Sequence, residues 1–248
     1  SHPAAAILAE VLAEVGVRHA VVSPGSRNAP IVLALHHHPD IELRVSIDER
    51  SAAHHALGIA LATWTPVPVV CTSGTAALNH GPALAEAFHS RIPLVSITAD
   101  RPSDVVGRGH GQTVFQTNVH ASHTVHSDVV DATQCDPVDL TQRIRHAMQM
   151  ARCGGAGKSS GPVHLNVPFT EPLYELTEAQ ALAGSAEKRN QIESESELPI
   201  PDRLREAIRR GKAIVLAGPR PYAAHQMTES RLEVNLPCLA ERGACISG

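Results

Sequence analysis

A regular alternation of apolar runs and helical patterns constrains this 248-residue chain more than any other feature of its sequence. Short runs rich in β-branched residues predict strands at 19–23, 41–47, 67–72, 94–98, 123–130 and 163–167. Helical periodicity predicts helices at 3–15, 31–38, 51–64, 76–90 and 136–153. Strands that alternate with helices form right-handed βαβ units. The sequence therefore predicts an α/β fold, a doubly wound and mostly parallel six-stranded sheet with helices on both faces.

The composition fits this fold and argues against several classes of protein. Aromatic residues make up only 2% of the chain, so the core must be built from Ala, Val, Leu and Ile, which suits helices packed on a parallel sheet. The net charge of −4 argues against nucleic acid as a partner. No apolar run is long enough to span a membrane, and no basic segment of a signal peptide precedes the Ala-rich N-terminus. We expect a cytoplasmic location.

Neither the cysteines nor the histidines form a metal-binding pattern. The five cysteines are scattered and include no Cys-x-x-Cys pair, which is typical of a reducing compartment. Histidine tracts occur at 36–38 and 54–55, but adjacent side chains on a helix point in different directions. The i, i+4 histidine pair with a carboxylate base is also missing. We therefore predict no metal site in this chain.

Four polar turns follow the first four predicted strands, at 23–27, 48–50, 72–75 and 100–102. The carboxyl ends of parallel strands lie at one edge of the sheet, where open α/β folds bind their ligands. Each turn alone could be a solvated connection, and Asp48, Glu49 and Arg50 could simply place acids at a helix N-terminus. Together the turns offer acids, arginines, hydroxyls and glycines, which suit a carboxylate or phosphate ligand. The sequence predicts a ligand site at this edge.

A long irregular stretch follows the fourth strand. Residues 103–121 contain Gly107, Gly109, Gly111 and the amides Gln112 and Gln116, without helical or strand periodicity. Loops of this length inside a compact domain are usually functional. We expect this loop to have a functional role.

The composition changes after the last predicted strand, which indicates a second part of the chain. Residues 176–199 are rich in Glu, Ser, Ala and Gln and predict a linker between domains. The pattern restarts at 200–248 with a helix at 203–210, a strand at 213–217 and a weak helix from Tyr222. About fifty residues are too few to bury a core alone. We expect the chain to be part of a longer protein.

The polar turns also carry a resemblance to a known family. The motifs are Ser-Pro-Gly-Ser-Arg at 23–27, Ser-Ile-Asp-Glu-Arg at 46–50, Thr-Ser-Gly-Thr-Ala at 72–76, Ala-Asp-Arg-Pro at 99–102 and Gly-Gln at 111–112, with further matches at 161–168 and 171–173. This set resembles the N-terminal part of the MenD family. Its members are the thiamine-diphosphate-dependent 2-succinyl-5-enolpyruvyl-6-hydroxy-3-cyclohexene-1-carboxylate synthases of menaquinone biosynthesis. By this resemblance, 1–175 is a pyrimidine-binding domain and 200–248 is an incomplete middle domain.

The resemblance implies roles for eight residues. Glu49 matches the catalytic glutamate that hydrogen-bonds the aminopyrimidine ring of the cofactor and promotes formation of its ylide. The residues that match the loop beside this ring are Thr72, Ser73 and Gly74. Those that match the substrate-binding positions are Ser26, Arg27, Arg101 and Gln112.

The implied enzyme is a transferase, a carboligase that joins decarboxylated 2-oxoglutarate to isochorismate. It uses thiamine diphosphate and Mg²⁺ and works as a dimer or tetramer, since the family builds its active site between subunits. Two features depart from the family. Gly111 stands where the family has Asn, and the Gly-Asp-Gly motif that holds the diphosphate and Mg²⁺ is absent from these 248 residues. We expect this chain alone to be inactive.

Two other interpretations remain open at this stage. The first is another thiamine-dependent carboligase of the acetolactate synthase type, although Ser26, Arg27 and Arg101 suit a more acidic substrate. The second is a non-catalytic α/β module that binds or assembles with a partner.

Overall fold

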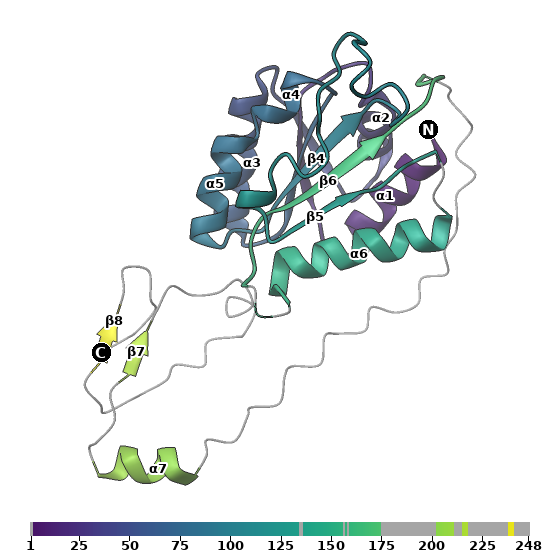
Figure 1. Cartoon of the computed structure of the whole chain (residues 1–248). Coiled ribbons are helices and arrows are strands. Elements are labelled where there is room, and N and C mark those ends of the chain that lie inside the picture. The colour runs from purple at the N-terminus through teal and green to yellow at the C-terminus, as the bar shows by residue number, and fades with distance from the viewer. Residues whose placement is uncertain are drawn as a thin grey trace. The chain divides into compact units, whose positions relative to one another are not determined.

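The computed structural model describes residues 2–133, 136–155, 157, 159–174, 202–210, 215–217 and 238–240. The chain divides into two compact units, Ser1–Gln180 and Ala181–Gly248 (Figure 1). The site predicted from the sequence lies entirely in the first unit.

The first unit is built on a six-stranded sheet whose pairs are all parallel. Its strands are β1 (His19–Val22), β2 (Glu42–Val45), β3 (Val67–Cys71), β4 (Leu94–Asp100), β5 (His126–Val129) and β6 (Val163–Pro168). They lie in the order β2-β1-β3-β4-β6-β5. The chain thus runs outward from β1 to β2 and then returns to the other side of β1 with β3. Ligands of open α/β sheets bind at such a switch point, here between the carboxyl ends of β1 and β3.

Helices cover both faces of this sheet (Figure 1). The elements are α1 (Pro3–Glu14), α2 (Ala29–His37), α3 (Glu49–Thr63), α4 (Thr75–Leu78), α5 (Gly81–Ser90), the 3₁₀ turn η1 (Ala121–His123) and α6 (Pro137–Cys153). One core cluster joins α1, α2 and α6 to the sheet, and a second joins α3 and α5 to its other face. The inner strands β3, β4 and β6 are buried at every position, as expected of strands that helices cover on both faces. The predicted α/β fold is confirmed.

The single helix predicted at 76–90 is wrong, because the structure divides this segment into α4 and α5. Pro82 lies in the first turn of α5. A proline has no amide hydrogen to continue the preceding helix, and it disfavours helical backbone in the residue before it. The break also lets His80 turn its ring into the core, where Nδ1 hydrogen-bonds Ser96 Oγ at 2.9 Å.

The second unit contains α7 (Asp202–Arg209) and a parallel pair of short strands, β7 (Val215–Ala217) and β8 (Cys238–Ala240). The helix α7 overlaps the helix predicted at 203–210, and β7 falls within the strand predicted at 213–217, whereas β8 was not predicted. The predicted linker and the weak helix from Tyr222 lie outside the described residues. The domain boundaries stay predictions. Within the described part of the chain, no helix combines the length and apolarity that a membrane crossing requires.

Candidate functional site

The turn after β1 is fixed against the turn after β3. A Cβ atom added to Gly25 would lie 2.4 Å from the Cβ of Thr72, so only glycine fits this approach. The Ser23 amide donates to the carbonyl of Val70 at 2.8 Å, and Asn28 Nδ2 donates to the carbonyl of Ser23 at 2.8 Å. The structure therefore brings the segment that carries Ser26 and Arg27 next to Thr72, at the switch point of the sheet.

The turn after β3 is tied in turn to the long loop. Ser73 Oγ donates to the carbonyl of Gln112 at 3.1 Å, and the Gly74 amide donates to Gln116 Oε1 at 2.8 Å. Gly74 has a φ of +93°, and Gln112 has a φ of +58°, so both adopt left-handed backbone at their contact. The residues predicted beside a cofactor ring and the predicted substrate residue Gln112 are thus neighbours.

A buried amide network lies beneath these turns. Gln116 Nε2 donates to Asn166 Oδ1 at 2.9 Å, and Asn166 Nδ2 donates to Asp100 Oδ2 at 2.7 Å. Thr98 Oγ1 also donates to Asn166 Oδ1, at 2.8 Å. The network holds the loop to the ends of β4 and β6. The sequence analysis missed Asn166, although an amide inside the apolar run of β6 was the available signal.

Two arginines meet at the same edge of the sheet. The Arg27 residue is only 5% exposed, and this burial lowers its pKa, with the nearby charge of Arg101 lowering it further. Asp100, also buried, accepts a hydrogen bond from the Arg101 amide at 2.7 Å. Burial raises the pKa of Asp100, and the hydrogen bonds from Asn166 and Arg101 oppose this rise. The structure thus brings Arg27 and Arg101 together with one acid between the two turns.

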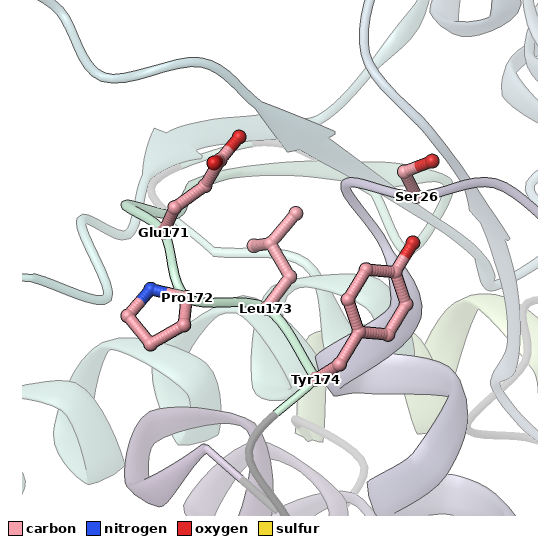
Figure 2. A pocket seen from close by; sticks show the side chains of 5 residues that line it. All are labelled: Ser26, Glu171, Pro172, Leu173 and Tyr174. Atoms are coloured by element: carbon pink, nitrogen blue, oxygen red, sulfur yellow. The ribbon is translucent and has the colours of Figure 1, made fainter.

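A pocket of about 500 Å³ opens beside Arg27. It is lined by Ser26, Glu171, Pro172, Leu173 and Tyr174 (Figure 2). Arg27 Nη1 donates to the carbonyl of Phe169 at 3.0 Å, and Nη2 donates to Glu171 Oε1 at 3.1 Å. The sequence analysis assigned no role to Glu171. Its signal was an acid directly after the last strand, but the pairing spans 144 positions and has no local pattern.

Glu49 is the first residue of α3 and stands apart from this arginine group. Asp48 caps the helix, because its Oδ1 accepts the Ser51 amide at 2.7 Å, and this hydrogen bond lowers the pKa of Asp48. The half-buried Glu49 carboxylate makes no hydrogen bond with any residue that the structure describes. It lies near the end of β3, since its charge adds to the effect of burial in raising the pKa of Cys71.

Three buried histidines, His80, His120 and His164, lie close to one another, and only His164 belongs to a strand, β6. The rings of His120 and His164 meet edge to face with centroids 5.1 Å apart. Burial lowers the pKa of His80 and of His164 to about 3, so both are neutral at physiological pH. Among the residues that the structure describes, no group of three or more His, Cys, Asp or Glu side chains could hold a metal ion.

Known proteins similar to this chain share one enzyme name. The family model described as "Thiamine pyrophosphate enzyme, N-terminal TPP binding domain" matches residues 3–124. A 2-succinyl-5-enolpyruvyl-6-hydroxy-3-cyclohexene-1-carboxylate synthase of Geobacillus kaustophilus is 39% identical over 96% of this chain and 42% of its own length. Residues 3–124 are therefore similar to the N-terminal domain of thiamine pyrophosphate enzymes.

Other relatives within the thiamine pyrophosphate enzymes carry the same name. The synthase of Flavobacterium psychrophilum is 44% identical over 71% of this chain and 31% of its own length. That of Staphylococcus haemolyticus is 36% identical over 91% of this chain and 40% of its own length. The chain therefore spans less than half the length of these relatives. The resemblance to the N-terminal part of this synthase family is confirmed.

Proposed function

We propose that this chain is the pyrimidine-binding domain and the beginning of the middle domain of a 2-succinyl-5-enolpyruvyl-6-hydroxy-3-cyclohexene-1-carboxylate synthase. The enzyme joins decarboxylated 2-oxoglutarate to isochorismate, and we expect it in the cytoplasm. The observation that carries this proposal is the proximity of Arg27 and Arg101, with Arg27 paired to Glu171 at the wall of the pocket. Both substrates are carboxylic acids, and guanidinium groups bind carboxylates with two parallel hydrogen bonds.

The proposed substrate side consists of Ser26, Arg27, Arg101 and Gln112. Burial fixes the Arg27 guanidinium in one orientation, so little side-chain entropy is lost when a carboxylate binds. Ser26 adds a hydroxyl at the wall of the pocket (Figure 2). Gln112 is held by the hydrogen bond from Ser73, which links the substrate side to the turn after β3.

The proposed cofactor side consists of Glu49 and the turn formed by Thr72, Ser73 and Gly74. The Glu49 carboxylate fits a thiamine ring because it is half-buried and has no described hydrogen-bond partner of its own. Glu49 would form a hydrogen bond with the ring nitrogen and exchange a proton with it. When bound, thiamine diphosphate supplies a thiazolium that stabilises a carbanion. Mg²⁺ would accompany the diphosphate, and we assign no residue of this chain to it.

A chimaeric enzyme tests the proposal directly. Residues 3–174 of this chain would replace the matching segment of the Geobacillus kaustophilus synthase, and product formation from 2-oxoglutarate and isochorismate would be measured with thiamine diphosphate and Mg²⁺. We expect turnover in the chimaera and its loss on Arg27→Gln. A folded chimaera that condenses two pyruvate molecules instead would favour an acetolactate synthase type of enzyme. A folded chimaera without either activity would favour a non-catalytic module.

A further inference from the structure

The guanidinium of Arg27 already holds a carboxylate in this structure. Nη2 donates to Glu171 Oε1 at 3.1 Å, while Nη1 donates to the Phe169 carbonyl. A guanidinium has five N–H donors, so these two bonds leave donors in reserve. Nε of Arg27 is buried and has no hydrogen-bond partner among the described residues, and the same holds for Nε of Arg101. The site is thus equipped for more carboxylate oxygens than Glu171 supplies.

The two partners of this ion pair differ sharply in their exposure. The side chain of Arg27 is 6% exposed, whereas that of Glu171 is 71% exposed. Glu171 lies on the segment that follows β6, and it lines the pocket together with Ser26 (Figure 2). The arginine cannot leave without opening the core, but the glutamate side chain can turn into water at little cost. Glu171 lines the pocket and pairs with Arg27 behind it. A carboxylate that enters the pocket would therefore reach the fixed guanidinium of Arg27 only by displacing the mobile carboxylate of Glu171.

The charges around Arg27 also favour the binding of an anionic ligand once Glu171 has moved away. Arg27 and Arg101 contribute two positive charges, and Asp100 and Glu171 are the acids whose charges act on Arg27. Asp100 is committed to other donors, since it accepts hydrogen bonds from Asn166 and from the Arg101 amide. Loss of Glu171 from the group would leave an excess positive charge beside the pocket. An anionic ligand would then restore the balance.

We propose that Glu171 is an internal carboxylate that occupies Arg27 in the free protein and that a substrate carboxylate must displace. This inference rests on the proposed function, in which Arg27 binds a substrate carboxylate. A substrate carboxylate would bind only the form of the protein in which Glu171 has left Arg27. Its apparent affinity is then its intrinsic affinity multiplied by the fraction of protein in that form. Glu171 would thus set the apparent affinity of the site and reject anions that bind Arg27 weakly.

Carboxylate binding to the full 248-residue chain tests this idea without any need for catalysis. Dissociation constants for 2-oxoglutarate and for benzoate, a ring monocarboxylate, would be measured by calorimetry and NMR titration. Glu171→Gln keeps the size of the side chain and removes its charge, so we expect it to bind these probes about tenfold tighter than the unmodified chain. Arg27→Gln should abolish the binding, both alone and combined with Glu171→Gln.

The matched control is Glu14→Gln, which removes an exposed ion pair with Arg145 on the surface of α1 and α6. We expect it to leave carboxylate affinity unchanged. A purely structural role of Glu171 would lower the unfolding midpoint without tightening the binding, and that result would overturn the proposal. A second result would also overturn the proposal for Glu171: Glu171→Gln and the unmodified chain bind the probes with equal affinity, and Arg27→Gln abolishes binding. That result would leave the proposed substrate role of Arg27 intact. Binding that survives Arg27→Gln, or no binding in any variant, would contradict both.

Discussion

At the scale of single residues, two adjacent acids have separate roles that their positions in the sequence do not distinguish. Asp48 and Glu49 both follow β2 and both precede the apolar positions of α3. Asp48 accepts the Ser51 amide and begins the helix, whereas the carboxylate of Glu49 bonds no described residue. The first acid therefore serves the fold, and the second is available for a ligand.

The first prediction concerns Glu49. In the chimaeric synthase, Glu49→Gln should lower kcat by about a hundredfold or more, because proton transfer by a positioned side chain contributes that much. Asp48→Asn is the matched control, since asparagine also caps helices well and should leave kcat close to the original. Steady-state kinetics on both variants, with circular dichroism to verify folding, provide the measurement. Equal losses in the two variants would contradict the separate roles.

The second prediction concerns the buried histidines. Burial holds the pKa of His164 at about 3, whereas an exposed histidine has a pKa of about 6.5. Above pH 6.5 the ring is neutral in both states, but below it the unfolded chain takes up a proton that the folded chain refuses. The free energy of unfolding should therefore fall by about 1.4 kcal/mol per pH unit for each such histidine.

The measurement is urea unfolding of the chain between pH 7.5 and pH 4.5. His164→Gln should give a shallower decline of stability with falling pH than the unmodified chain, whatever its effect at pH 7.5. The control His55→Gln removes an exposed histidine of α3 and should leave the slope as it was. An unchanged slope in His164→Gln would show that the ring is protonated in the folded state.

At the scale of elements, the contact between the turns after β1 and β3 depends on a missing side chain. Gly25→Ala would place a methyl group 2.4 Å from the Cβ of Thr72 and force the two turns apart. We expect a loss of about 1–3 kcal/mol in the free energy of unfolding, as overpacking typically causes. Substrate affinity in the chimaera should fall as well, because Ser26 and Arg27 follow this turn directly.

Gly58 offers the opposite case for comparison. It lies inside α3, and a Cβ added there would meet nothing within 4 Å. Gly58→Ala should therefore stabilise the chain by about 0.5–1 kcal/mol, because alanine is the better helix former. Urea unfolding at one pH measures both variants. Equal stability of Gly25→Ala and Gly58→Ala would mean that the two turns are not in contact.

The elements themselves were predictable because their signals are local. Alternating runs and helical periods depend on neighbours within a few positions, and they gave six strands close to the observed ones. The break before α5 was missed, although Pro82 was visible in the sequence, because the run of alanines continues across it. The bonds from Asn166 to Asp100 and from Arg27 to Glu171 span 66 and 144 positions, and no period predicts which distant polar groups meet.

At the scale of the whole molecule, one edge of the sheet carries exposed apolar side chains, which the described residues of the first unit do not cover. Among the described strands, the edge strand β2 pairs only with β1, and Val45 at its end is 64% exposed. Ile47 follows it and is 86% exposed. Both lie just before Glu49. Exposed apolar surface next to a ligand site is typical of a surface that another protein covers.

We therefore predict that a second copy of the chain covers this edge. Ile47→Lys should weaken self-association at least about tenfold, because burial of an isoleucine contributes about 1.5–3 kcal/mol and a buried unpaired charge opposes it. Val138→Lys is the matched control. Val138 is 63% exposed, and it lies on α6, which is a different element from β2 and covers a face of the sheet. Sedimentation velocity over a range of concentrations measures the association of all three proteins. If the unmodified chain sediments as a monomer at high concentration, the prediction is wrong. If Val138→Lys causes dissociation and Ile47→Lys does not, the interface lies on α6 and not on β2.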